Sequence, residues 1–128
     1  MEVLKHWAVS LVFVVLTIFT PVKAMVITTI TLIMCDLILG MIAAMKRKET
    51  ITSTRLKRTG IKLFVYPTAI LLGFLTQQYL TGDSVPVTNI TAGMLGLTEL
   101  LSCLENLNDI SGQNLLKALI DKIGSQER

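Results

Sequence analysis

The chain has 128 residues, of which 52% are hydrophobic and only 16% are charged, and its formal net charge is +3. Soluble domains carry about 25% charged residues, and here the uncharged residues are gathered into long runs, so the composition excludes an ordinary soluble domain. A single histidine and no zinc-ligand spacing leave metal catalysis and serine–histidine chemistry without the residues they need. We therefore expect no enzyme and no catalytic, cofactor-binding or metal site. Cys35 and Cys103 both lie in apolar segments, where free thiols are favoured over a disulfide.

The apolar runs predict an all-α, multi-pass membrane protein with three to four transmembrane helices. A run of about 18 or more apolar residues can cross the hydrocarbon core of a bilayer. The predicted helices cover residues 4–20, 24–45, 63–80 and 90–108, with a basic cytoplasmic loop at 46–62. Together they form a membrane domain, residues 1–109. The cytoplasmic tail, residues 110–128, predicts a short amphipathic helix with Ser111 as candidate N-cap and Gly124 as candidate end.

The first apolar run ends at Pro21 and carries Trp7 near one end, where an indole ring favours the headgroup level of a membrane. Lys5 before the run and Val22-Lys23-Ala24 after it would also fit a cleaved signal peptide. Cleavage there would leave a mature chain starting directly in the next membrane segment. We therefore expect a retained first helix.

The second and fourth segments each contain one acidic residue. A strongly apolar residue contributes about −0.3 to −0.6 kcal/mol to insertion, and a central acid costs about 3 kcal/mol. The second segment has nine such residues, so about −4 kcal/mol outweighs the cost of Asp36. The fourth has six, so about −2.7 kcal/mol only balances the cost of Glu99. We expect the second helix to insert by itself, and the fourth to need partner helices or to lie partly in the interface.

Seven of the twelve Lys and Arg residues lie between positions 46 and 62. Short loops rich in these residues stay on the cytoplasmic side of a membrane, so we expect a cytoplasmic N-terminus. Nucleic-acid binding is the rival interpretation, but no aromatic residue is interleaved with the charges, and contact with anionic lipid headgroups accounts for them. The seven membrane-surface residues are Lys46, Arg47, Lys48, Arg55, Lys57, Arg58 and Lys62.

Small and polar residues line one face of each of the last three predicted membrane helices. Small residues four apart let helices approach closely, and polar ones bond across the contact. The residues proposed for helix packing, self-association or a lumen are Asp36, Gly40, Ala44, Ala69, Gly73, Ala92, Gly96, Glu99, Ser102 and Asn106. These faces either hold the helices of one chain together, or they drive self-association and line a water-filled path. Both interpretations stay open.

The two acids lie on these faces, and an acid within a membrane usually faces a bundle interior, a partner or water. No cation lies inside any predicted membrane segment. We therefore expect no buried ion pair within one chain. Only Lys46 and Lys62, at the segment ends, are placed to reach a neighbour's acid.

Three short motifs occur in order along the chain: Asp36-x-x-x-Gly40, STRLKRTG ending at Gly60, and Glu99-x-x-Ser102-x-x-x-Asn106. In this membrane context the chain resembles the phage lysis and toxin-secretion holin family over roughly residues 36–106. The resemblance implies a small protein of the bacterial inner membrane that accumulates, associates with itself and opens lesions for an endolysin or toxin, without stable contact with it. The motif residues would mark the family and would not be catalytic.

The C-terminal region departs from the resemblance, because many holins end in a strongly basic tail. Here Lys117, Lys122 and Arg128 stand against four acids, Glu105, Asp109, Asp121 and Glu127. Two rival functions remain. One is a membrane-anchored subunit of a larger complex, such as a virion-associated genome-delivery channel. The other is an ion-coupled channel or transporter, against which a short chain without inverted repeats argues. The expected partners are the lipid bilayer and further copies of the chain, with no nucleic acid and no cofactor.

Overall fold

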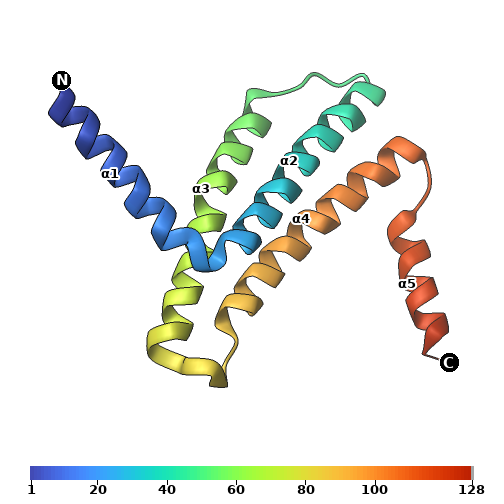
Figure 1. Ribbon diagram of the computed structural model, residues 1–128. Helices are drawn as coiled ribbons and strands as arrows, with labels where there is room; N and C mark the ends of the chain where they lie inside the picture. Colours follow the sequence, from blue (N-terminus) through green and yellow to red (C-terminus); the bar gives the residue numbers. More distant parts are fainter. Residues whose placement is uncertain (128) are drawn as a thin grey trace.

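The computed structural model describes residues 1–127 and contains no strand over that range. Five α-helices follow one another along the chain (Figure 1): α1 (Glu2–Phe19), α2 (Lys23–Lys46), α3 (Ser53–Thr76), α4 (Val87–Ser111) and α5 (Leu115–Gln126). Three helical stretches are long and apolar enough to cross a membrane, namely Glu2–Lys46, Ser53–Ser84 and Val87–Ser111. The predicted all-α, multi-pass membrane architecture is confirmed.

The first of these stretches divides at Pro21. Its 45 residues would extend about 68 Å, roughly twice the hydrocarbon thickness of a bilayer. A short 3-10 helix, Thr20–Val22, separates α1 from α2, because proline cannot donate the hydrogen bond that a continuous α-helix needs. The two helices diverge from this point like the arms of a V (Figure 1).

Helices α2, α3 and α4 form a bundle, in which α2 and α4 run in the same direction and α3 runs against both (Figure 1). Its core is small and consists mainly of Ile33, Ala43, Ala44, Ile70 and Cys103. Most of the large apolar side chains lie on the outside instead. That distribution suits lipid as the surrounding solvent, since lipid chains are as apolar as the side chains that face them.

Helix α3 begins at Ser53, so the predicted loop at 46–62 was too long. The non-helical connection is confined to residues 47–52. Hydropathy marks only the part of a helix that lies in hydrocarbon, whereas Arg, Lys and Leu are good helix formers that extend the helix beyond it. Four of the seven basic residues therefore lie on α3, namely Arg55, Lys57, Arg58 and Lys62, and Lys46 is the last residue of α2.

Helix α4 runs from Val87 to Ser111, longer at both ends than the predicted 90–108. Gly112 ends it with φ +70°, the left-handed conformation that glycine adopts without a steric penalty. The N-cap of α5 is Asn114, whose side chain accepts the Lys117 N–H at 2.9 Å. The expected Ser111 cap and Gly124 end were therefore wrong, because Ser111 still belongs to α4 and Gly124 lies inside α5.

Candidate functional site

Glu99 is the centre of a polar cluster inside the bundle. Its side chain, on α4, is fully enclosed, with 0% of its surface exposed. The Lys62 ammonium lies 2.9 Å and 3.0 Å from the two carboxylate oxygens, and the Tyr66 hydroxyl donates to the carboxylate at 2.7 Å. Lys62 and Tyr66 are four residues apart on α3, so both reach the same carboxylate. A buried charge is tolerated in this way when it is paired and hydrogen-bonded.

Asp36 extends the cluster to α2. Its Oδ2 lies 3.7 Å from the same Lys62 ammonium, and its Oδ1 accepts a hydrogen bond from the Asn106 side-chain amide at 2.8 Å. The Asn106 amide also lies 3.4 Å from the Asp36 backbone oxygen. Only 21% of the Asp36 side chain and 23% of the Lys62 side chain is exposed. One lysine therefore joins two acids from different helices, and the cluster ties all three helices together.

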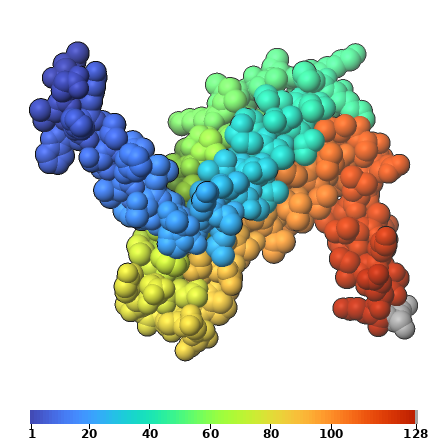
Figure 2. Space-filling model, in the orientation of Figure 1, coloured from blue at the N-terminus to red at the C-terminus, as the bar shows by residue number. Residues whose placement is uncertain are grey.

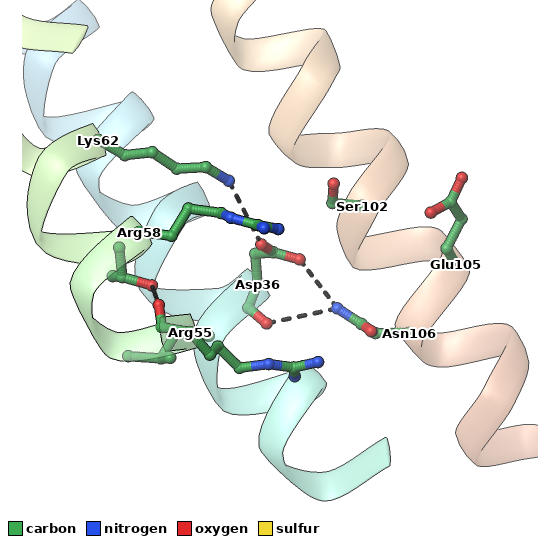
Figure 3. A pocket seen from close by; sticks show the side chains of 9 residues that line it. Asp36, Arg55, Arg58, Lys62, Ser102, Glu105 and Asn106 are labelled. Atoms are coloured by element: carbon green, nitrogen blue, oxygen red, sulfur yellow. Dashed lines mark hydrogen bonds and ion pairs between the residues drawn. The ribbon is translucent and has the colours of Figure 1, made fainter. Parts of the chain in front are cut away.

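A polar pocket of about 270 Å³ opens beside this cluster. Figure 3 shows Arg55, Arg58 and Lys62 extending from α3 in one direction, toward Asp36 and Asn106 on the facing helices. The α4 wall adds two further polar side chains, Ser102 and Glu105. The pocket thus collects side chains that the sequence separates by up to 70 positions.

Two of the small residues allow close approaches. A Cβ on Gly40 would overlap the Arg55 guanidinium, so the bare backbone makes room for that side chain. A Cβ on Gly73 would lie 3.1 Å from the Thr91 hydroxyl of α4. Gly96 is looser, since its Cβ would meet only the end of Leu32 at 3.8 Å. Gly40 and Gly73 therefore leave room for side chains of the neighbouring helices α3 and α4.

The carboxyl ends of α2 and α4 are joined next to the pocket. The Lys46 ammonium lies 2.5 Å from the Ile110 carbonyl oxygen, and the Arg47 guanidinium lies 2.5 Å from Asp109 and 3.1 Å from Glu49. A cation at the last carbonyls of a helix also suits the helix dipole. The hydrogen bond from Arg47 lowers the pKa of the Glu49 carboxyl below its usual range.

The packing residues predicted from the sequence occupy different positions in the structure. Asp36, Gly40, Glu99 and Asn106 converge on the cluster or its pocket. Ser102 also lines the pocket. The remaining five lie elsewhere: Ala44 and Gly73 are buried in the bundle, Ala69 is half-buried on α3, and Ala92 and Gly96 line a shallow apolar groove beside α2.

The expectation of no buried ion pair within one chain was wrong. Lys62 was assigned to the membrane surface, and Tyr66 was not recognised as a site residue. Lys62 lies one residue before the apolar part of α3, and its long stem carries the ammonium into the bundle. The four-residue spacing of Lys62 and Tyr66 was a signal in the sequence, but only the packing of α3 against α4 shows that both side chains point at Glu99.

Two helices have large apolar surfaces that no other part of residues 1–127 covers. No residue of α1 is buried, and Trp7 is 72% exposed. Helix α5 exposes Leu119, Ile120 and Ile123 along one face. Figure 2 shows both helices projecting from the bundle as separate arms.

Comparison with known proteins agrees with this membrane architecture. The family model described as the bacteriophage holin family matches residues 13–126. The chain belongs to the bacteriophage holin family. The match covers α2, α3 and α4, which carry the polar cluster, together with the end of α1 from residue 13 and all of α5. No curated protein and no solved structure matches this holin.

Proposed function

We propose that this holin accumulates in the bacterial inner membrane, associates with further copies of itself and opens lesions through which an endolysin or toxin passes. Membership of the holin family supports the class of function. The observation that carries the proposal is the enclosed polar cluster. Each chain has an apolar outer surface that is stable in lipid. Its interior is charged, and these charges can line a water-filled lesion only when the helices separate.

The unpartnered helix α1 suits association between copies. Its apolar side chains are exposed along the whole helix, from Val3 to Ile18. In a dilute membrane lipid covers them, and at high density the same surface of another copy replaces the lipid. Packing between copies that competes with packing inside the bundle would then draw α2, α3 and α4 apart.

Separation of the bundle helices would turn the cluster toward water. Asp36, Lys62 and Glu99 would then line the lumen of the lesion, where their charges are hydrated. A charge that crosses the membrane field is worth about 2.3 kcal/mol per 100 mV, and this energy supports collapse of the membrane potential as the proposed trigger. The basic residues around the α2–α3 connection support a cytoplasmic location for that side of the bundle and for the N-terminus.

The experiment is expression of the full chain from a tightly controlled promoter in a bacterium, with and without a cytosolic muralytic enzyme. Culture density and membrane potential are followed together. We expect a sudden loss of potential, and lysis only when the enzyme is present. Continued growth at a high level of the chain in the membrane would contradict the proposal.

Substitution of the cluster acids tests their part in the mechanism. Asp36→Asn combined with Glu99→Gln is expected to change the time of lysis, because it alters the charges that separation of the helices must expose. Asp83→Asn, in the exposed connection before α4, is the matched control and should keep the normal time. The same lysis time in all three proteins would contradict a role for the acids.

A further inference from the structure

Two arginines in the polar pocket have no ion-pair partner among residues 1–127. Arg55 and Arg58 both line the pocket, yet among residues 1–127 no carboxylate lies within 4 Å of either guanidinium. Lys62, by contrast, is engaged by Glu99 and Asp36. The pocket therefore contains two guanidinium groups that are free to bind an anion.

The fold holds the two arginines toward the same space. Positions 55, 58 and 62 follow the three- and four-residue steps that place side chains on one face of a helix. Figure 3 shows their side chains extending in parallel from α3 across the pocket. Gly40 leaves room for the Arg55 guanidinium beside α2. Lys57 of the same helix does not line the pocket and is exposed.

The pocket lies about one hydrocarbon thickness away from the opposite end of the bundle. From Lys62 to Leu80, α3 and the short π-helix that continues it, Gln77–Thr81, rise about 27 Å, and from Val87 to Asn106, α4 rises about 28 Å. The hydrocarbon core of a bilayer is about 30 Å thick. If the opposite connection, residues 81–86, lies at one surface, the pocket lies at the other surface, where phosphate groups are concentrated.

We propose that this pocket binds the phosphate diester of an anionic phospholipid, with phosphatidylglycerol as the matching headgroup. Arg55 and Arg58 donate hydrogen bonds to the phosphate oxygens, for which the planar guanidinium is geometrically suited. On the opposite wall, the Ser102 hydroxyl and the Glu105 carboxylate accept hydrogen bonds from the glycerol hydroxyl groups. Basic pockets between membrane helices bind anionic headgroups in this manner. A choline headgroup offers no such donors.

The site differs from the diffuse attraction that any basic loop has for an anionic surface. Diffuse attraction depends on the number of charges and not on which arginine carries them. The pocket requires Arg58 and is indifferent to Lys57, although the two residues are neighbours with the same charge. The proposal rests on membrane insertion alone and is independent of lesion formation.

Native mass spectrometry of the purified full-length chain in detergent measures lipid binding directly. Phosphatidylglycerol, phosphatidylethanolamine and phosphatidylcholine with the same acyl chains are added in turn. We expect one molecule of phosphatidylglycerol to bind at least tenfold more tightly than either of the others. Arg58→Gln should weaken this binding at least fivefold, Arg58→Lys should restore part of it, and Lys57→Gln should leave it unchanged. Arg58 is exposed, and far-UV circular dichroism checks that each variant keeps its fold.

Other outcomes overturn the proposal. Equal losses for Arg58→Gln and Lys57→Gln would indicate diffuse attraction, and equal binding of the three lipids would exclude a headgroup site. Inorganic phosphate and glycerol 3-phosphate are added as soluble competitors. If either displaces phosphatidylglycerol at millimolar concentration, the site takes a free phosphate and the assignment to lipid is wrong.

Discussion

Replacement of Lys62 by methionine tests the polar cluster most directly. Methionine keeps the unbranched shape of the side chain and removes its charge. Glu99 would then retain only the Tyr66 hydroxyl as a partner, although its side chain has no exposed surface. Removal of one member of a buried ion pair costs about 3 to 5 kcal/mol. We therefore expect Lys62→Met to lower the free energy of unfolding of the bundle by about that amount.

A double substitution separates the ion pair from the packing of the side chains. Lys62→Met combined with Glu99→Met removes both charges, and replacement of a buried pair by apolar residues of similar volume is often neutral or stabilising. The loss in the double variant should be smaller than the sum of the two single losses by about 2 kcal/mol or more. Lys57→Met is the matched control on the same helix and should change stability by less than about 0.5 kcal/mol.

The assay is unfolding in mixed detergent micelles by increasing amounts of dodecyl sulfate, followed by far-UV circular dichroism. All four variants and the unchanged protein are compared at the same protein-to-detergent ratio. A loss for Lys62→Met no larger than that for Lys57→Met would refute the pairing. Additive losses in the double variant would show that Lys62 and Glu99 do not interact.

Two further predictions concern helix packing and the α2–α3 connection. Gly73→Ala should destabilise the bundle by about 1 to 3 kcal/mol, because its Cβ would lie 3.1 Å from the Thr91 hydroxyl. Gly60→Ala, whose Cβ would meet nothing within 4 Å, should stabilise it by about 0.5 to 1 kcal/mol in the same assay; equal effects would contradict the close approach of α3 and α4. Since the pKa of Glu49 is lowered by Arg47, the contribution of their pair is present above the ordinary glutamate pKa and is lost as the pH falls through the lowered value. Carbon-13 NMR titration of the carboxyl should show this pKa rising toward its ordinary value in Arg47→Gln, and an unchanged pKa would refute the pairing.

Much of the fold could be predicted from local properties of the sequence. Apolar length located the membrane helices because the hydrocarbon thickness of a bilayer sets the length of a spanning segment. Pro21 divided the first two helices because the chemistry of proline is local. The predicted ends of helices that extend beyond the apolar segments were less accurate. Nothing apolar marked the start of α3 at Ser53, and the end of α4 at Ser111 depends on Gly112 and on contacts with the end of α2.

The candidate site was predicted only in part. Asp36, Glu99 and Asn106 were recognisable because polar residues are costly within apolar runs. Lys62 and Tyr66 were missed as their partners because neither is unusual at its own position. A lysine at a helix end and a tyrosine near it are typical of any membrane surface.

By itself the sequence determined that this protein is helical, crosses a membrane and carries acids where they need partners, since apolar length and the cost of burying charge are properties of each segment alone. Only the tertiary structure decided which partners those acids have. The direction in which α3 packs against α2 and α4 sets where the Lys62 ammonium, the Tyr66 hydroxyl and the two free arginines point. These contacts depend on the distances between side chains that are far apart in the chain. Such distances cannot be obtained from the spacing of residues along one helix.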